Sequence, residues 1–418
     1  MHATLSPSIA ATPAGERAAE ILKSCVHCGF CNATCPTYRL LGNELDGPRG
    51  RIYQIKSLLE GETPAAPVQL HLDRCLGCRA CETTCPSGVA YAELLDTGRE
   101  MVEEALPRPW HQRLRRRALR RILPDPVWLS RLMRIARALR SLMPAALSAH
   151  VPPPPADPGA WPSPRHPRRA TALAGCVQSE ATPRTNAAAA RVLDRAGISL
   201  SIAPGTGCCG ALSHHLGARE EGLALAQRNI EAWHAALEDG AEAIVASASG
   251  CGAHLREYGR LFSGDGEMAR KAQRVAAAVR DLSELVPAEL AQQAAAAVGD
   301  APRLAVHSPC TLVHAQRLGG RVESLLGAAG CALSPVPDGG VCCGSAGSYS
   351  ILQPELASRL GAAKADALQT GDPDLIVTAN IGCQLHIARH ARVPVRHWIE
   401  ILDERLAALP QTQGSIAP

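Results

Sequence analysis

The pattern of apolar and polar positions divides the second half of the chain into two similar series of strands and helices. Short apolar runs alternate with longer stretches whose apolar residues recur at helical spacing. The first series predicts strands at 170–174, 198–202 and 243–246, with helices at 187–196 and 220–237. The second predicts strands at 303–306, 332–336 and 375–378, with helices at 322–329 and 354–368. Gly197 and Gly330 are expected to end the first helix of each series.

The two series are copies of one ancestral unit. The segment LAGCVQ at 173–178 matches HSPCTL at 307–312, GCCGA at 207–211 matches VCCGS at 341–345, and ASASGCGAH at 246–254 matches TANIGCQLH at 378–386. The same 32 positions separate Cys176 from Cys208 and Cys310 from Cys342. A duplication that keeps this spacing indicates two structural units of one fold.

Each unit is expected to gather its own set of cysteines. Strands that alternate with helices favour a parallel sheet, and the loops after the strands of such a sheet meet in one crevice. In both units the cysteines follow the predicted strands. The first set is Cys176, Cys208, Cys209, Cys251 and His254, and the second is Cys310, Cys342, Cys343, Cys383 and His386.

Two interpretations of these sets stay open at this stage. Four thiols per unit at matching positions exceed what packing needs, which favours a third iron–sulfur cluster or one cluster per unit. Alternatively, the Cys-Cys-Gly turns are structural, and Gly210 and Gly344 supply the turn conformation. Cys331 has no counterpart and is expected to be a buried thiol. Hydrogen-bonded structural roles are expected for four nearby histidines, His214, His215, His307 and His314.

The first hundred residues carry a different cysteine pattern, which occurs twice. CVHCGFCNATCP places Cys25, Cys28, Cys31 and Cys35 before a proline, and CLGCRACETTCP does the same for Cys75, Cys78, Cys81 and Cys85. This is the bacterial ferredoxin run, in which the fourth cysteine of each run serves the other cluster. The predicted ligands of one [4Fe–4S] cluster are therefore Cys25, Cys28, Cys31 and Cys85, and those of the other are Cys75, Cys78, Cys81 and Cys35.

Zinc is the alternative metal for these eight thiols. Four thiolates also suit zinc, but a zinc ribbon uses two pairs of cysteines and leaves the central third cysteine of each run unexplained. The doubled pattern favours two [4Fe–4S] clusters, which indicates an electron-transfer function. His27 and Phe30, inside the first run, are expected to pack beside its cluster.

Composition and charge limit the cellular compartment and the classes of partner that this protein is expected to have. The 418 residues include 17 cysteines, which predicts several domains in a reducing, intracellular compartment. No basic segment precedes Arg17 and no apolar core is present there, so we expect no secretion. No apolar run approaches the ~18 residues that a membrane-spanning helix needs. A net charge of +4 and 3% aromatic residues argue against nucleic acid as a partner.

A basic region and a linker separate the two halves of the chain. The proline-rich stretch at 151–167 is expected to be a stiff, extended spacer. Before it, residues 108–140 contain eleven arginines and a single acidic residue, Asp125. Apolar residues at helical spacing lie within this stretch, at Leu132, Ile135, Ala136 and Leu139. The region either docks on anionic lipid or an acidic partner, or forms helices packed on the chain's own domains.

Two ferredoxin runs followed by paired Cys-Cys-Gly units resemble the iron–sulfur subunits of respiratory hydroxyacid oxidation. That family includes subunits for glycolate, glycerol-3-phosphate and lactate. The local sequence is most similar to the glycolate oxidase (glycolate dehydrogenase) iron–sulfur subunits. The segments that carry the likeness are CVHCGFCNATCPTY, GNELDGPRGRIYQIKSLLEG, HLDRCLGCRACETTCPSGV, CCGSAGSYS and TANIGCQLH. The resemblance extends from Ser24 to Leu402.

The resemblance implies a function that the residues alone do not specify. In that family a flavin subunit oxidises glycolate to glyoxylate, and the iron–sulfur subunit passes the electrons towards a quinone. It implies FAD-binding glycolate oxidase subunits and a quinone or another electron acceptor as partners. The implied location is cytoplasmic, with or without peripheral contact with the inner membrane.

Two alternatives differ in substrate or in chemistry. The first is the equivalent subunit of a lactate or glycerol-3-phosphate dehydrogenase. The second is a thiol–disulfide reductase that resembles the heterodisulfide reductases, which hold unusual clusters on Cys-Cys-Gly domains. Their last motif is Cys-x-x-Cys, whereas His254 and His386 take the final position here, which counts against the same chemistry.

The expected fold is therefore a multidomain α+β and α/β architecture. A helical ferredoxin-type module with two [4Fe–4S] clusters is predicted at 15–105, and the basic region with its linker at 106–167. The two repeated α/β Cys-Cys-Gly domains are predicted at 168–290 and 301–408. No Gly-x-Gly-x-x-Gly follows a strand, so we expect any flavin on another chain. No catalytic residue is assigned, because no Ser-His-Asp or paired-carboxylate pattern stands out.

Overall fold

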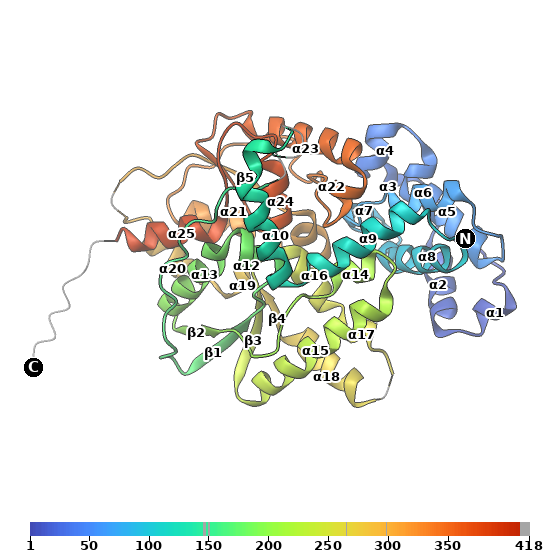
Figure 1. Ribbon diagram of the computed structural model, residues 1–418, viewed down its shortest axis with the longest axis horizontal. Coiled ribbons are helices and arrows are strands. Elements are labelled where there is room, and N and C mark those ends of the chain that lie inside the picture. The colour runs from blue at the N-terminus through green and yellow to red at the C-terminus, as the bar shows by residue number, and fades with distance from the viewer. Residues whose placement is uncertain (145–147, 149–150, 265, 298, 410–418) are drawn as a thin grey trace, which may run out of the picture.

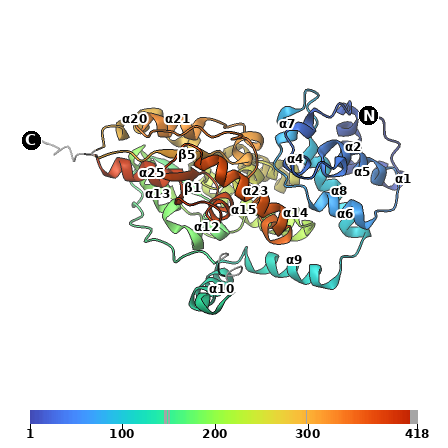
Figure 2. The same cartoon turned by 90° about the horizontal axis from the view of Figure 1, so that it is seen from above.

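The computed structural model describes residues 1–144, 148, 151–264, 266–297 and 299–409. Helices from the first hundred residues form one end of the molecule, and two α/β units form the rest (Figure 1). Helices α9 (Trp110–Ile122) and α10 (Pro126–Ala138) run along one side of the molecule (Figure 2). A helical module followed by two α/β units confirms the predicted fold class.

The N-terminal module is built from short helices whose starts are fixed by proline and polar caps. Pro13 takes the first position of its helix, and the Thr12 side chain accepts a hydrogen bond from the Gly15 N–H. Gly98 allows two helices to approach closely, because a Cβ there would lie 2.6 Å from Ile55 Cγ1. The elements are α1 (Pro7–Ala10), α2 (Pro13–Ser24), α3 (Phe30–Ala33), α4 (Pro36–Leu41), η1 (Glu44–Asp46), α5 (Pro48–Leu59), α6 (Ala66–Asp73), α7 (Ala80–Thr84) and α8 (Tyr91–Ala105).

The first α/β unit contains a parallel sheet with the strand order β2-β1-β3-β4. Its strands are β1 (Arg168–Ala172), β2 (Ile198–Ser201), β3 (Ala241–Ala246) and β4 (Val279–Asp281). Its helices are α12 (Cys176–Ala181), α13 (Pro183–Arg195), α14 (Ala211–His215), α15 (Arg219–Glu238), α16 (Ser249–Arg256), α17 (Tyr258–Leu261), α18 (Glu267–Ala278), α19 (Leu282–Leu285) and α20 (Ala288–Ala294). The chain reverses its direction of travel across the sheet at β1, so the loops after β1 and β3 flank a crevice.

The second unit repeats this plan with a smaller parallel sheet in the order β5-β6-β7. Its strands are β5 (Leu304–His307), β6 (Leu375–Thr378) and β7 (Val395–His397). Its helices are the π-helical turn η3 (Thr311–Ala315), α21 (Arg321–Ala328), α22 (Tyr349–Leu352), α23 (Pro354–Gln369), α24 (Ile381–Ile387) and α25 (Trp398–Ala407). A short 3-10 turn, η2 (Arg140–Leu142), follows α10.

One predicted strand is wrong. The segment at 332–336 contributes only a single parallel bridge, between Leu333 and Leu304. Pro335 and Pro337 lack the N–H that a ladder requires, so the apolar pattern there does not produce a strand. Every other predicted strand and helix of the two units is present, with its ends shifted by at most four residues. Gly197 and Gly330 have φ of +76° and +80°, as expected for residues that end a helix.

The proline-rich linker lies on the first unit. Residues 152–165 form no helix or strand. The Trp161 indole N–H donates to the Leu200 carbonyl at 2.8 Å, and the Arg165 N–H donates to Ser199 Oγ at 2.9 Å. The segment therefore follows the outer strand β2 and is held there by side chains and backbone.

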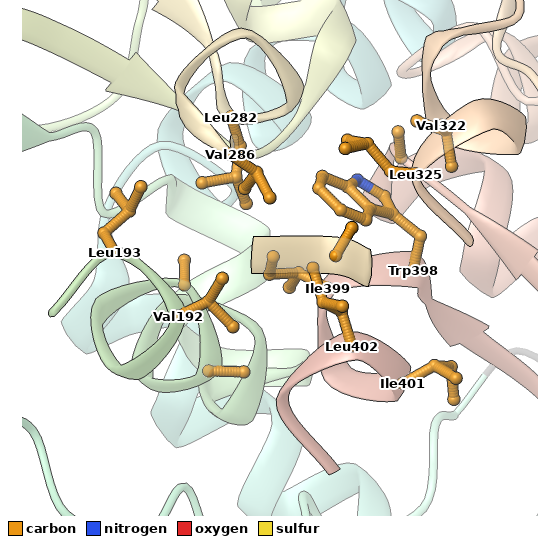
Figure 3. Packing of buried hydrophobic residues seen from close by; sticks show 14 of the residues in the cluster. Val192, Leu193, Leu282, Val286, Val322, Leu325, Trp398, Ile399, Ile401 and Leu402 are labelled. Atoms are coloured by element: carbon orange, nitrogen blue, oxygen red, sulfur yellow. The ribbon is translucent and has the colours of Figure 1, made fainter. Parts of the chain in front are cut away.

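Helices of each unit pack against helices of the other across a shared core. The C-terminal helix α25 of the second unit packs on α13 of the first, and α20 of the first packs on α21 of the second. Trp398 and Leu402 from α25 meet Val192 from α13 and Val286 from the first unit (Figure 3). Polar bonds at the rim reinforce this contact, since Thr185 Oγ1 donates to Glu400 Oε1 at 2.6 Å. This packing fixes how the two sheets sit relative to each other.

Replacing Trp398 with alanine should destabilise this shared core. The indole is fully buried, and truncating such a side chain costs about 3–5 kcal/mol through lost packing and the cavity left behind. Urea denaturation followed by circular dichroism will measure the effect. The matched control is Trp110→Ala, because Trp110 is 70% exposed and its loss should change stability by less than about 0.5 kcal/mol. Equal midpoints for the two variants would contradict the role of the shared core.

Candidate metal centres

The two ferredoxin-type loops have the same backbone shape. The third residue of each loop, His27 or Gly77, has a φ of +58° or +62°. The fifth residue, Gly29 or Arg79, has a φ of +86° or +61°. Two left-handed residues in five turn the chain tightly enough to aim three thiols at one point. The Arg79 conformation is supported by its side chain, which bonds Glu82 Oε2 at 2.8 Å and also Glu257 of the first α/β unit.

Each loop borders a cavity that also receives a cysteine from the other run. The first cavity is lined by the thiols of Cys25, Cys28, Cys31, Cys81 and Cys85. The second is lined by those of Cys35, Cys75, Cys78 and Cys81. His27 and Phe30 border the first cavity, which places them beside it as expected. Cys81 lies between the two cavities, so the two sets of sulfur atoms are neighbours.

The crowding of these thiols shows in their acidity. Burial and the nearby thiols of Cys25, Cys85 and Cys28 raise the pKa of Cys31 to about 11. Burial and the thiols of Cys78 and Cys75 raise the pKa of Cys81 well above its usual range. Without a cation such groups keep their protons, whereas a bound metal reverses the balance and deprotonates its thiol ligands. The donor set and its crowding therefore fit a metal centre.

Buried arginines favour negative charge at the second cavity. Burial alone would raise the pKa of Cys75, but the guanidinium groups of Arg51 and Arg99 reverse this and lower it. The Gly77 N–H also donates to Cys75 Sγ at 3.5 Å, and the Tyr91 hydroxyl donates to it at 3.6 Å. Arg51 is 1% exposed and is held by the His71 carbonyl at 2.7 Å. These positive and hydrogen-bonding groups would stabilise a negatively charged sulfur centre in this cavity.

The first α/β unit brings its four cysteines together. Cys176 begins α12, Cys208 and Cys209 precede α14, and Cys251 lies on α16. Hydrogen bonds from the Cys176 and Cys209 thiols lower the pKa of Cys208. The Cys208 and Cys251 sulfurs in turn raise the pKa of Cys209, as does burial. The sulfur atoms of these cysteines are therefore close enough to influence one another.

The glycine after each cysteine pair is required by the backbone. Gly210 and Gly344 have φ of +85° and +87°. A Cβ would lie 2.7 Å from the Gly222 carbonyl oxygen in the first unit, and 2.9 Å from the Ala357 carbonyl oxygen in the second. This is the turn role that the structural interpretation predicted. It is compatible with a metal site, because the same turn aims the two thiols before it.

The second unit gathers its cysteines in the same way. The Cys310 and Cys342 sulfurs lie 3.8 Å apart, and the Gly344 N–H donates to Cys342 Sγ at 3.5 Å. The Cys343 and Cys383 sulfurs lie within 4.8 Å of each other and of a ring nitrogen of His307. Burial and the nearby Lys364 lower the pKa of His307 to about 3.

Asn380 connects the two units at their cysteine sets. Its Oδ1 accepts a hydrogen bond from the Gly250 N–H at 3.1 Å, next to Cys251 of the first unit. Its Nδ2 donates to Cys383 Sγ of the second unit at 3.4 Å. The two crevices therefore face each other across this side chain.

The ferredoxin-type module is seated against the second unit. Burial and the thiol of Cys310 raise the pKa of Cys78, so these two sulfurs are electrostatic neighbours. Thr83 Oγ1 shares a hydrogen bond of 2.8 Å with His314 Nδ1, which joins α7 to η3. Arg39 bonds Asp338 at 3.0 Å at the edge of the same contact. The second cavity and the thiols of Cys310 and Cys342 are thereby brought together.

Comparison with known proteins identifies both halves of the chain. Residues 21–89 match the 4Fe-4S dicluster domain family, and residues 170–256 and 304–388 each match the Cysteine-rich domain family. The glycolate oxidase iron-sulfur subunit of Escherichia coli (strain K12) is 52% identical over 92% of this chain and 94% of that protein. The probable glycolate oxidase iron-sulfur subunit of Bacillus subtilis (strain 168) is 31% identical over 88% of each chain.

The chain belongs to the glycolate oxidase iron–sulfur subunit family. Similarity to the lactate branch is narrower, because lactate utilization protein A of Bacillus velezensis is 27% identical over 52% of this chain and 92% of that protein. The resemblance read from the cysteine runs and the Cys-Cys-Gly units is confirmed. Iron–sulfur clusters are therefore the metal centres that this donor set and this family share.

The histidines near the cysteines of this family member have different roles from one another. His214 Nε2 lies 3.3 Å from Asp96 Oδ2 of α8, and His215 Nδ1 lies 3.7 Å from Asp96 Oδ1, so both join the first unit to the helical module. The His254 ring contacts those of His214 and His215, with centroids 5.4 and 5.8 Å away. His314 is hydrogen-bonded as predicted.

The expectation for His307 is wrong. Among the residues that the structure describes, neither of its ring nitrogens has a hydrogen-bond partner, although the residue is 2% exposed. Cys331 is buried as predicted, within the core that the two units share.

Some residues of the basic region contact other parts of the chain, and others form an exposed face. On α9, Arg116 pairs with Asp73 at 2.9 Å and Arg120 with Glu221 at 3.6 Å, so part of its charge is used within the chain. Helix α10 packs on α12 and buries Leu129 and Ala136. Within the described part of the chain, no helix has the length and apolarity needed to cross a bilayer.

Proposed function

We propose that this protein is the electron-transfer subunit of a flavin-dependent glycolate oxidase (glycolate dehydrogenase) complex. FAD-binding partner subunits would oxidise glycolate to glyoxylate, and this chain would take the electrons on towards a quinone or another acceptor. The observation that carries the proposal is the unbroken succession of sulfur sets from the first cavity to the second unit. When bound, iron–sulfur clusters supply one-electron transfer without bond chemistry of their own.

We assign the eight ferredoxin-type cysteines to two [4Fe–4S] clusters with exchanged fourth ligands. Cys25, Cys28, Cys31 and Cys85 would hold one cluster, and Cys75, Cys78, Cys81 and Cys35 the other. The cavity linings support this division, since Cys85 borders only the first cavity and Cys35 only the second. The shared border at Cys81 supports direct passage of electrons between them.

We further propose that the Cys-Cys-Gly units bind an additional iron–sulfur centre. Its ligands would come from Cys310, Cys342, Cys343 and Cys383, with a matching set of Cys176, Cys208, Cys209 and Cys251 in the first unit. Two observations support this. The thiols of each unit are crowded, five of the eight cysteines are buried, and the second set lies beside Cys78. Lys364, which is 3% exposed, places a cation near these sulfurs and would favour their negative charge.

Removal of one thiol from the succession should stop electron transfer. Cys78→Ser in the complex with the flavin subunits should reduce glycolate-dependent reduction of a quinone analogue to the level seen without this chain, because Cys78 stands between the second cavity and the second unit. Lactate and glycerol-3-phosphate serve as comparison substrates. Cys331→Ser is the control, since that thiol lies in the shared core away from every set. Full quinone reduction by the Cys78 variant would refute the relay.

The exchange of fourth ligands can be tested by counting iron. The double variant Cys28→Ala/Cys85→Ala should lose about four irons per chain, because both residues would serve one cluster. The matched variant Cys28→Ala/Cys35→Ala should lose about eight, because it would remove a ligand from each cluster. Iron and acid-labile sulfide after anaerobic purification provide the measurement. The reverse result would mean that each run holds its own cluster.

We also propose that α10 docks this protein on an anionic membrane surface. Trp128, Leu132, Ile135 and Leu139 recur at helical spacing and are 48%, 41%, 57% and 44% exposed. The exposed arginines Arg131 and Arg134 lie between them, and exposed Arg140 follows at the start of η2. An exposed apolar stripe flanked by arginines is typical of helices that lie in the membrane interface. The helix stands at the outer side of the molecule, where a flat surface can reach it (Figure 2).

Charge reversal on α10 and at the start of η2 should weaken membrane binding. Each basic residue near an anionic surface contributes about 1 kcal/mol, so Arg131→Glu/Arg134→Glu/Arg140→Glu should lower the partition coefficient at least about 100-fold. Sedimentation with vesicles containing phosphatidylglycerol is the measurement. The control reverses three exposed arginines of the α/β units, Arg195, Arg303 and Arg392, which changes the net charge equally. Equal binding by both triple variants would contradict docking through α10.

A further inference from the structure

His307 is buried without the hydrogen bonds that a buried histidine normally makes. It is the last residue of β5, and 2% of it is exposed. Among the described residues, neither Nδ1 nor Nε2 has a partner. By contrast, buried His397 shares a hydrogen bond of 2.9 Å with the Ser247 carbonyl. Leaving a buried polar group unpaired is unfavourable, so such a position calls for an explanation.

The ring lies against two cysteine sulfurs. A nitrogen of His307 and the sulfurs of Cys343 and Cys383 lie within 4.8 Å of one another. Ligands that share one tetrahedral metal stand about 3.5–3.8 Å apart, given metal–nitrogen and metal–sulfur bonds of about 2.0–2.3 Å. A closing movement of roughly an ångström would therefore bring all three onto one ion. The three residues come from the end of β5, from the loop before α22 and from helix α24, so no local sequence motif links them.

We propose that His307 is a nitrogen ligand of the metal–sulfur centre in the second unit, bound to the same metal ion as Cys343 and Cys383. The inference rests on the proposed centre in that unit and specifies its ligands. It accounts for the unpaired ring, because a metal ion takes the nitrogen lone pair that no donor satisfies. It also explains why a polar residue ends a strand whose other members are apolar.

The nitrogen ligand makes the two units different. The residue three positions before the first cysteine is His307 in the second unit and Leu173 in the first. Leucine cannot bind a metal. The ring nitrogens of His254 in the first unit also lack partners among the described residues, but they do not lie within 4.8 Å of two cysteine sulfurs as His307 does. The other histidine of the second motif does not replace His307, because His386 Nε2 donates to the Ala357 carbonyl at 3.0 Å.

A neutral imidazole in place of a thiolate changes the redox properties of a centre. Replacement of cysteine by histidine removes negative charge around the iron and raises the reduction potential. The second unit is also the one beside Cys78. A centre that has His307 as a ligand is therefore expected to have a higher potential than the same centre with a cysteine at position 307.

Magnetic resonance of the full-length protein can detect this bond directly. The protein is labelled with ¹⁵N-histidine and purified anaerobically, and pulsed electron paramagnetic resonance then measures ¹⁵N coupling to the paramagnetic centres. The wild type should show strong coupling from a directly bound nitrogen. His307→Leu, which copies the first unit, should lose that coupling and the metal of the second unit, while about eight irons remain in the ferredoxin-type module. His307→Cys should keep the metal, lose the coupling and shift its potential downward.

The controls separate failure of this inference from failure of the centre itself. Cys331→Ser, in the same unit, should leave both metal content and coupling unchanged. Wild-type coupling in His307→Cys would overturn the nitrogen ligand, and that variant decides the matter if His307→Leu does not fold. If Cys343→Ser and Cys383→Ser lose metal whereas His307→Leu does not, only the ligand assignment fails. If none of these variants loses metal, the second unit holds no centre, and the relay through the ferredoxin-type clusters is then judged by the Cys78 assay alone.

Discussion

Crowded, buried sulfur is the constraint on which the rest of this structure depends. Every cysteine except Cys331 belongs to one of the four cysteine sets, and burial together with neighbouring sulfurs raises the pKa of members such as Cys31, Cys81 and Cys209. Such thiols resist ionisation, because burial and like charge both oppose the thiolate. The surrounding fold offsets this with fixed positive groups. Arg51 and Arg99 face Cys75, and backbone N–H groups at Gly77 and Gly344 point at sulfur. These features make sense when the sets carry cations and the sulfurs are ionised.

In the α/β units, the ends of the parallel strands position the cysteines. Parallel strands deliver their following loops to one edge, so cysteines far apart in sequence meet without any local motif. The helices packed across the shared core then fix one crevice against the other, and Asn380 bridges them with bonds to Gly250 and Cys383. The helical module is fastened to this pair by Thr83 with His314 and by Arg79 with Glu257. These contacts hold the proposed centres close together, which is what electron transfer between them requires.

The sequence predicted the features that depend on the spacing of residues along the chain. It did not predict those that depend on which residues lie nearby in the folded structure. The cysteine runs and the matched repeats led to the correct family and to the four sulfur sets, because metal ligands are few and their intervals distinctive. The strand at 332–336 was wrong because prolines override an apolar pattern. The role of His307 was missed because its signal is the absence of partners, which only three dimensions reveal. The sequence offered a hint in the histidine at position 307, where the first repeat has Leu173. The helical periodicity predicted an apolar face on α10, but it did not predict which side of the helix the neighbouring elements would cover.

The packing of α25 on α13 also determines the order in which the two units can finish folding. Thr185 of α13 bonds Glu400 of α25, 215 residues later in the chain. During synthesis, domains tend to fold as they leave the ribosome, in order from the N-terminus. The first unit cannot follow that rule fully, because the apolar face of α13 stays uncovered until α25 has been made. A nascent chain therefore carries an unfinished first unit while the second is still being translated, and contacts of such long range form slowly. The first unit is therefore completed late, and a chain that ends before α25 leaves the apolar face of α13 exposed to non-specific association.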